Sequence, residues 1–367
     1  MPVAYAARPH TVLPPHRIST EEILADMAVQ LEGHPQLSRF EQIIGSCGVE
    51  TRHFTRPLND PVRSAETRIA ERNAASYEDS LALAVEAAEG ALANAGLEAG
   101  DIDAVVTSHT SSWASPGIDV DLLYRLGLPS HVRRTPMSGL ACVGGALALS
   151  KGAETVANPF VSDVEHVLVV VAETLSTIYD YRNPSIRSTL YNALFGDGAA
   201  AVVLSRRRLG PGMAIEHTWE YLLPDSRDHY FGQLTDQRFV FESTPKALRG
   251  PGAIMPALHE WLARRTSRYA AGDGGSPSVD GSERPRWVVV HPGGPRILEA
   301  VAEGLALDAD ALAPSWTSLR TCGNLGGVAL LHILQLRHDD PPAPGEPGLG
   351  LAFGPGFTAA ALWGHWA

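Results

Sequence analysis

One cysteine, one histidine and one asparagine of this chain lie in settings where they could carry out acyl transfer. Cys142 lies among small residues (GLACVGGA) and precedes an apolar run that predicts a buried helix. A cysteine at a helix N-terminus meets unpaired N–H groups and the helix dipole, which favour the nucleophilic thiolate. His291 ends a predicted strand, where it could hold Cys142 as a thiolate and later donate hydrogen bonds. Asn324 offers a neutral amide donor that could stabilise an oxyanion or an enolate.

Each of these residues also has an ordinary structural explanation. A free cysteine is most often an inert core residue, and a single histidine at a strand end is most often satisfied within the fold. An asparagine in a glycine-rich segment often occupies a turn. Cysteine, histidine and asparagine also occur together in cysteine proteases, where the asparagine orients the histidine. The residue types alone therefore leave the function open.

Pairs of similar segments indicate that the chain consists of two related halves. The run ACVGGALAL around Cys142 matches CGNLGGVALL around Asn324, which lies at the cysteine's position 182 residues later. The same spacing relates VTSH, ending at His109, to VVVH, ending at His291, and the run FGDGAAA resembles the later run FGPGFTA. Internal repeats fix the architecture of a chain. We therefore expect two pseudo-symmetric halves that bring Cys142, His291 and Asn324 towards one centre.

The elements that would position these residues alternate between helices and strands. Apolar patterns predict a helix at 76–95, ending near Gly96, and strands at 102–107, 166–172, 195–204 and 287–290. This alternation is typical of an α/β fold with sheets covered by helices on both faces. A Gly/Pro/Arg-rich segment at 206–213 marks the join. We expect an N-terminal half at 1–207 with the cysteine and a C-terminal half at 208–367 with the histidine and asparagine.

Composition limits the compartment and the partners of the protein. The 367 residues are 44% hydrophobic, contain no apolar run long enough to span a membrane and begin without an apolar signal segment. Three cysteines give no disulfide framework, which suits a reducing cytoplasm. A formal net charge of −12 argues against a nucleic-acid partner. We expect a cytoplasmic protein in which an anionic substrate needs a local basic patch, formed from Arg39, Arg52 and Arg296.

These motifs resemble the type III polyketide synthases, the family of chalcone and stilbene synthases. The similarity spans nearly the whole chain, and its most specific element is the run HPGGPRIL that begins at His291. The pair Gly323-Asn324 and the Phe-Gly-X-Gly runs at Phe195 and Phe353 accompany it. The resemblance implies a thiolase-like αβαβα fold of five layers, a homodimer, and coenzyme A thioesters as substrates, without a further cofactor, a metal or a membrane.

The resemblance also implies roles for individual residues. Cys142 would carry the starter and the growing chain. His291 and Asn324 would bind the malonyl thioester carbonyl and stabilise the enolate that decarboxylation leaves. Phe195 and Phe241 would be gatekeeper aromatics, although each is also explained as a core aromatic. The implied reaction is the iterative decarboxylative condensation of malonyl-CoA onto an acyl-CoA starter, followed by cyclisation to an aromatic or pyrone product.

Three further positions of the substrate cavity depart from members of the family. Ser115 stands where plant members have a methionine that reaches into the partner's cavity, and Gly326 where they often have serine. Thr110 lies near a position at which bacterial tetrahydroxynaphthalene synthases have a second cysteine. Smaller side chains leave more room, which favours an acyl-CoA starter and a pyrone or resorcinol-type ring. Of the plant enzymes' basic CoA-binding region, only Arg39 keeps its character.

Two other functions stay open at the level of the sequence. A ketoacyl synthase III-like enzyme or thiolase relative would perform one condensation and stop. Those enzymes usually show a His-Gln-Ala-Asn type of turn in place of HPGGP, which favours the iterative enzyme. A non-catalytic thiolase-fold binding protein or a cysteine hydrolase is the alternative from a different class.

Overall fold

The computed structural model describes residues 3–64, 66–178, 186–236, 239–270 and 284–367. Its N-terminal half is built on β5 (Ala104–His109), which lies between and parallel to β6 (Arg133–Met137) and β7 (His166–Thr174). Strand β8 (Asp197–Ser205) pairs antiparallel with β7. Every residue of β5, β7 and β8 is buried, as expected for strands covered by helices on both faces.

The C-terminal half repeats this arrangement. β12 (Trp287–Val290) is parallel to β13 (Pro347–Gly354), which pairs antiparallel with β14 (Thr358–Trp366). β9 (Met213–Leu222) pairs with the far edge of β14. The N-terminal strand β1 (Ala4–Ala6) pairs with both β8 and β9 and so joins the two halves into one sheet.

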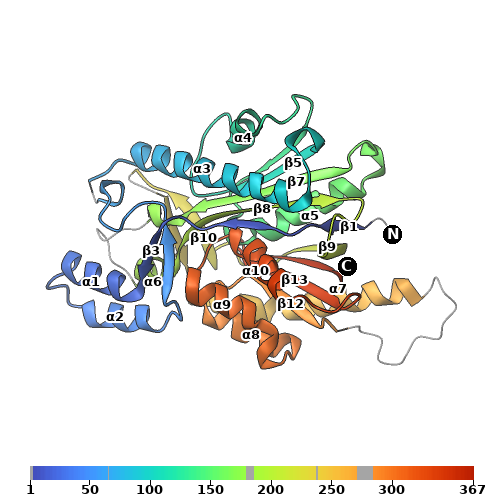
Figure 1. The fold of residues 1–367 in the computed structure, drawn as a ribbon. Helices are drawn as coiled ribbons and strands as arrows, with labels where there is room; N and C mark the ends of the chain where they lie inside the picture. The colour runs from blue at the N-terminus through green and yellow to red at the C-terminus, as the bar shows by residue number, and fades with distance from the viewer. Residues whose placement is uncertain (1–2, 65, 179–185, 237–238, 271–283) are drawn as a thin grey trace.

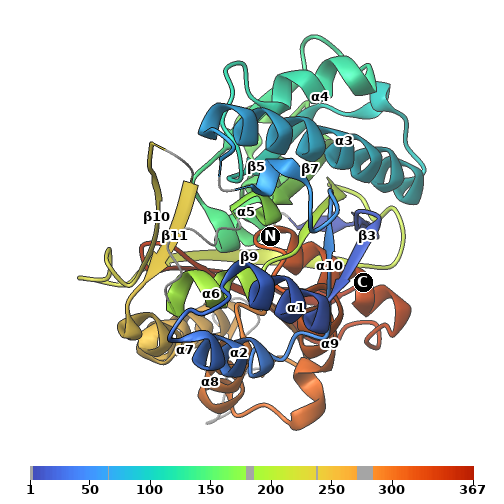
Figure 2. The same cartoon turned by 90° about the vertical axis from the view of Figure 1, so that its left-hand side faces the viewer.

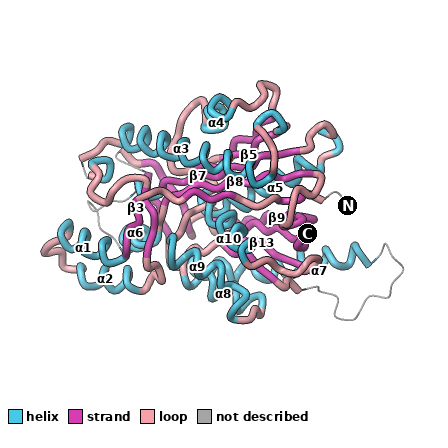
Figure 3. Tube along the Cα trace, in the orientation of Figure 1, coloured by secondary structure: helices cyan, strands magenta, loops and turns pink. Residues whose placement is uncertain are grey.

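Helices form one layer between the two halves of the sheet and one layer on each outer side (Figures 1 and 3). The middle layer consists of α5 (Gly144–Ala157) and α10 (Val328–Asp339). The outer layers consist of α3 (Ile69–Ala95) and α4 (Ile118–Leu126) on one side, and α7 (Gly250–Ala270), α8 (Pro295–Leu305) and α9 (Ala313–Cys322) on the other. One apolar cluster packs the middle helices against both halves of the sheet, and one further cluster lies on each outer side. The predicted five-layered α/β fold is confirmed.

Smaller elements gather at the end of the molecule that faces the viewer in Figure 2. They are α1 (Thr20–Gln30), α2 (Leu37–Gly45), α6 (Ile186–Leu194), the pair β3 (His16–Ser19) and β4 (Thr51–Phe54), and the hairpin β10 (Tyr230–Leu234) and β11 (Phe239–Ser243). A further short strand, β2 (His10–Val12), pairs with β8. Helix α2 packs against α6, which leads directly to Phe195.

The sequence predicts the bounds of one long helix and the position of the join between the two halves. Helix α3 begins at Ile69, earlier than the predicted residue 76, and ends where predicted, at Gly96 with φ 66°. A glycine accepts this left-handed conformation without a steric penalty. The Gly/Pro/Arg-rich segment connects β8 to β9, and we propose that the halves divide there, at residues 207 and 208. In the part of the chain that the structure describes, no helix has the length and apolar character needed to cross a membrane.

Candidate active site

Cys142 lies in a single 3₁₀ turn, Ala141–Val143, that runs directly into α5. Ala141 has φ 47°, a left-handed conformation that costs a residue with a Cβ atom roughly 1–2 kcal/mol. Its amide N–H donates to Oγ1 of Thr110 at 3.0 Å, which anchors the strained turn to the end of β5. The cysteine therefore lies at a helix N-terminus, as the sequence predicts.

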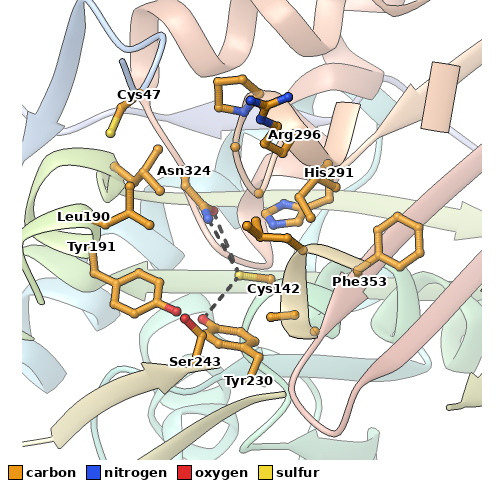
Figure 4. Close-up of a pocket in the computed structure, with 18 of the residues that line it drawn as sticks. Cys47, Cys142, Leu190, Tyr191, Tyr230, Ser243, His291, Arg296, Asn324 and Phe353 are labelled. Carbon is orange, nitrogen blue, oxygen red and sulfur yellow. Dashed lines mark hydrogen bonds between the residues drawn. The ribbon is translucent and has the colours of Figure 1, made fainter. Parts of the chain in front are cut away.

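Two glycines allow the N-terminal ends of the middle helices to meet at this point. A Cβ atom on Gly145 would lie 2.0 Å from the carbonyl oxygen of Gly327, so the two backbones are in direct contact. Helices α5 and α10 thus begin side by side, and Cys142 and Asn324 are brought together from the two halves. Nδ2 of Asn324 lies 3.9 Å from Sγ of Cys142 (Figure 4).

The amide group of Asn324 has a fixed orientation. Its Oδ1 atom accepts the backbone N–H of Gly326 at 2.9 Å, which leaves Nδ2 as the donor beside the sulfur. The backbone of Asn324 is held as well, because its N–H donates to Leu194 at 2.7 Å and its carbonyl accepts from Gly196 at 3.1 Å. The Phe-Gly-Asp-Gly run found in the sequence therefore supports the asparagine directly.

His291 faces the same cavity, next to Cys142 and Asn324 (Figure 4). Its side chain is 1% exposed, and neither ring nitrogen has a hydrogen-bond partner among the described residues. Buried polar groups nearly always have partners, so these nitrogens are available to a ligand. Burial lowers the pKa of His291 to about 3, which keeps the imidazole neutral with one N–H to donate.

Burial and the helix N-terminus have opposite effects on the pKa of the Cys142 thiol. It raises the pKa of the Cys142 thiol to about 11, while hydrogen bonds with Tyr230 and Asn324 act in the opposite direction. The Tyr230 hydroxyl lies 3.9 Å from Sγ. Burial therefore favours the thiol form of Cys142, in contrast to the thiolate that the sequence suggested.

The cavity that these three residues share has a volume of 470 Å³, within the range of small-molecule sites. Its walls come from both halves and include Ser46 and Cys47, directly after α2. At the rim, Arg296 is 77% exposed and lies 3.2 Å from Glu299, one turn along α8. The site thus combines a buried nucleophile and two neutral donors with a charged opening.

Four aromatic side chains pack together at one wall of this cavity. Tyr191 and Tyr230 line the cavity itself. Phe195 stacks on Tyr191 with ring centroids 5.3 Å apart, and Phe241 stacks on Tyr230 at 5.6 Å. The two phenylalanines predicted to bind substrate therefore lie behind the tyrosines and do not line the cavity. Neither tyrosine was predicted to line the site, because no repeat or motif in the sequence marks them.

A second cavity, of 270 Å³, is lined by Thr110 and, just before the Cys142 turn, by Ser138 and Gly139. The backbone N–H groups of Thr110 and Ser111 donate to Oε2 of Glu173, at 3.3 and 3.0 Å. Glu173 is fully buried, which raises the pKa of its carboxyl to about 8. Glu173 was not predicted as a site residue, because it lies near the end of an apolar strand without a motif of its own.

Like the two phenylalanines, two further residues predicted for the substrate cavity line neither cavity within one chain. Gly326 has φ 59°, and a Cβ atom there would lie 3.2 Å from Leu175 and 3.4 Å from Glu173. A bulkier residue at this position would strain the backbone instead of filling the site. Ser115 is exposed in the loop after β5. Its contact with the second subunit of a homodimer stays a prediction.

The three arginines predicted to bind coenzyme A have different environments. Arg296 lies at the rim of the cavity, and Arg39 is exposed on α2 outside the cavity lining. Arg52 is 0% exposed, and its guanidinium donates to Oγ1 of Thr20 at 3.1 Å and to the carbonyl of Ala193 at 2.5 Å. The assignment of Arg52 to CoA binding is therefore corrected, because a fully buried guanidinium cannot reach a phosphate in solvent.

The fold and the site define a thiolase-like acyltransferase. Residues 36–207 match the family model of the N-terminal domain of chalcone and stilbene synthases, and residues 214–365 match that of the C-terminal domain. The chain belongs to this family of type III polyketide synthases, whose members act on CoA thioesters without a further cofactor. Among the described residues, no group of His, Cys, Asp or Glu side chains could hold a metal ion.

Several known proteins are similar to this chain over almost its entire length. A 1,3,6,8-tetrahydroxynaphthalene synthase of Streptomyces peucetius subsp. caesius is 33% identical, over 97% of this chain and 92% of the relative. A phloroglucinol synthase of Pseudomonas fluorescens is 26% identical, over 98% of each. Germicidin synthase of Streptomyces coelicolor has a similar structure, with a TM-score of 0.88 at 29% identity over 100% of both chains.

Proposed function

We propose that this protein condenses malonyl-CoA repeatedly onto an acyl-CoA starter held on Cys142, and then cyclises the chain to an aromatic or pyrone product. The observation that carries this proposal is the pair of Cys142 and Asn324, 3.9 Å apart, from the two halves of the chain. With His291 they surround one buried cavity. A nucleophile beside two neutral donors suits thioester exchange followed by enolate formation.

Loading of the starter uses Cys142 alone as the covalent group. Its sulfur attacks the thioester carbonyl, a new carbon–sulfur bond forms, and coenzyme A leaves as the thiol with the proton of Cys142. Because burial favours the neutral thiol, the proton leaves the sulfur as the attack proceeds. His291, which has two unpartnered nitrogens, is the group available to transfer it.

Extension uses the donors of His291 and Asn324. Both hydrogen-bond to the thioester oxygen of malonyl-CoA, on which negative charge develops as carbon dioxide leaves. The resulting enolate attacks the thioester on Cys142, and the lengthened chain returns to that sulfur for the next cycle. Neutral donors in a water-poor cavity stabilise such charge strongly because they need no reorganisation.

Arg296 and Arg39 are proposed to contact the phosphates of coenzyme A. Arg296 is exposed at the cavity rim, so it can meet an anion while the thioester lies inside. Arg39 extends the positive charge along α2. These two arginines would give an anionic substrate a local positive partner on a chain of net charge −12.

The starter is proposed to be an aliphatic or aryl acyl-CoA, because Thr110 and Ser115 are small where relatives carry larger or nucleophilic side chains. A second candidate is malonyl-CoA as its own starter, as expected if this chain shares the product in the name of its 33% identical relative. The Tyr230 hydroxyl beside Cys142 also offers a polar contact to a short polar starter.

Incubation with radiolabelled malonyl-CoA, alone and with a panel of acyl-CoA starters, separates these cases by mass spectrometry. Products of several extensions that appear only with an added starter are expected. Efficient formation of tetrahydroxynaphthalene from malonyl-CoA alone would establish the second candidate instead. A single condensation would indicate a ketoacyl synthase III-like enzyme, and no new carbon–carbon bond would contradict the proposal.

The protein is further proposed to be a cytoplasmic homodimer. The loop at 111–117, which leaves the end of β5, is expected to lie against the partner as in the family. Trp113 in this loop is 76% exposed, a large apolar surface that a partner would cover. Sedimentation at micromolar concentration checks this, and a monomer of 39.1 kDa would contradict it.

A further inference from the structure

The buried side chain of Arg52 lies next to the Asn324 segment but has no part in the proposed chemistry. Arg52 is 0% exposed on β4, and a Cβ atom added to Gly323, the neighbour of Asn324, would lie 3.5 Å from the Cβ atom of Arg52. We propose that Arg52 is a positioning residue, which holds the amide of Asn324 at the distance from Cys142 that enolate stabilisation needs. This inference rests on the role of Asn324 in the proposed function.

Arg52 and Asn324 bind two adjacent residues at the C-terminal end of α6. Nη2 of Arg52 donates to the carbonyl oxygen of Ala193 at 2.5 Å, and the backbone N–H of Asn324 donates to that of Leu194 at 2.7 Å. The last carbonyl groups of a helix have no partner within the helix, and the negative end of the helix dipole stabilises a cation. A displacement of this helix end would therefore also move the backbone of Asn324.

The guanidinium of Arg52 is itself held in place by the first residue of α1. Nη2 of Arg52 also donates to Oγ1 of Thr20, at 3.1 Å. The single hydroxyl hydrogen of Thr20 is directed to the carbonyl oxygen of Val49, so Oγ1 is free to accept from Arg52. The nitrogen thus lies between two fixed oxygen atoms, and Ala193 is held by a charge-assisted hydrogen bond, which is stronger than a neutral one.

The same strand holds the other backbone segment that leads to Asn324. The hydroxyl of Thr51, next to Arg52 on β4, donates to the carbonyl oxygen of Thr321 at 2.8 Å. Phe195, which directly follows α6, pairs with Asn324 as in a parallel sheet. β4 is thus bonded to both of the backbone segments that meet at the asparagine, and Arg52 supplies the bond to the α6 side.

A direct effect of its charge is the other way in which Arg52 could assist the reaction. The positive charge acts to lower the pKa of Cys47, in the wall of the cavity, against the larger effect of burial. Such a cation would also stabilise an enolate without the help of Asn324. The two roles differ in one respect, because a positioning residue has no effect once the amide of Asn324 is removed, whereas a charge still acts.

A double-mutant cycle of Arg52→Met and Asn324→Ala in the full-length chain separates these roles. The measured quantity is the rate of malonyl-CoA decarboxylation per Cys142 that forms a thioester with the starter, so misfolded chains, which load no starter, are not counted. Arg52→Met alone should slow this rate by about 10- to 10²-fold, the cost of a misplaced catalytic group. In the Asn324→Ala chain the same substitution should change the rate by less than about twofold, the usual error of such cycles.

Thr20→Val is the second variant, and it keeps the test decisive if Arg52→Met does not fold. In this chain Arg52 keeps its charge but loses one of the two oxygen atoms that hold its guanidinium. Decarboxylation per loaded site should slow when Asn324 is present and stay unchanged when Asn324→Ala is added. Arg52→Lys, whose ammonium group can donate to both oxygen atoms, should recover part of the rate that Arg52→Met loses.

Arg206→Met is the control, since Arg206 also donates to a backbone carbonyl, that of Val164 at 2.6 Å, beyond the end of α5 that lies opposite to Cys142. Its rate per loaded site should equal that of the native chain. An unchanged rate in Arg52→Met, or an equal reduction with and without Asn324, would overturn the proposal. Normal decarboxylation in Asn324→Ala alone would instead contradict the proposed function of the asparagine.

Discussion

Gly145 and Gly327 are in contact through their backbones where α5 and α10 begin, and no side chain fits between them. A Cβ atom on Gly145 would lie 2.0 Å from the Gly327 carbonyl oxygen, a rigid backbone atom. The two glycines are counterparts in the two halves of the sequence. Their contact sets how closely Cys142 approaches Asn324, so it couples the packing of the middle layer to the geometry of the site.

Gly145→Ala is therefore expected to lower the free energy of unfolding by about 1–3 kcal/mol, the usual cost of overpacking. Because the helices must separate, thioester formation on Cys142 should fall as well. Urea denaturation and starter loading measure the two effects. Gly45→Ala is the control, since nothing lies within 4 Å of its added Cβ atom at the end of α2. Equal free energies of unfolding for the two variants would contradict this expectation, because they would show that α5 and α10 accommodate the added Cβ atom without cost.

Cys142→Ala is expected to abolish both starter loading and product formation. Cys47 is the sharpest control, because it lines the same cavity as a second buried thiol. Burial raises the pKa of Cys47 to about 12, and its Sγ donates to the Ile43 carbonyl at 3.1 Å. Cys47→Ala should keep its activity, as should Cys322→Ala. Trapping the labelled starter on Cys47 or Cys322 would show that the nucleophile is misassigned.

The repeated spacing in the sequence explains which parts of the site could be predicted. Cys142 and Asn324 occupy the same place in two copies of one motif, so a shared centre followed from the spacing alone. Tyr230 reaches the sulfur from a hairpin with no counterpart in the repeat, and nothing in its sequence surroundings indicates this. Arg52 was misassigned because a sequence does not show whether an arginine faces solvent or, as here, donates to buried oxygens.

Glu173→Gln is expected to change how stability depends on pH. Burial raises the pKa of this carboxyl from 4.5 to about 8 in the folded protein. Between these values the folded state holds a proton that the unfolded state releases, so the stability contributed by Glu173 falls as pH rises, by up to about 1.4 kcal/mol per unit. Glutamine carries no titrating proton and can still accept the N–H groups of Thr110 and Ser111.

The measurement for Glu173 is urea denaturation of both proteins between pH 5 and pH 8. The unfolding free energy of Glu173→Gln relative to the native chain should rise across this range. Glu32→Gln, at an exposed position, controls for the loss of one carboxyl group. Parallel profiles for the native chain and Glu173→Gln would mean that the carboxyl is already ionised in the folded protein.

Asn324→Ala separates decarboxylation from loading. The Nδ2 donor lies 3.9 Å from Sγ of Cys142, where the enolate oxygen is expected, and its removal should slow malonyl-CoA decarboxylation by about 10²–10³-fold. Starter loading should persist, because it uses the thiol of Cys142 and proton transfer by His291 but not the amide of Asn324. Asn324→Asp is the matched variant: its carboxylate can still accept the Gly326 N–H but has no donor and repels the enolate. It should therefore be at least as slow as Asn324→Ala, and normal decarboxylation with lost loading in either variant would assign Asn324 to the loading step instead.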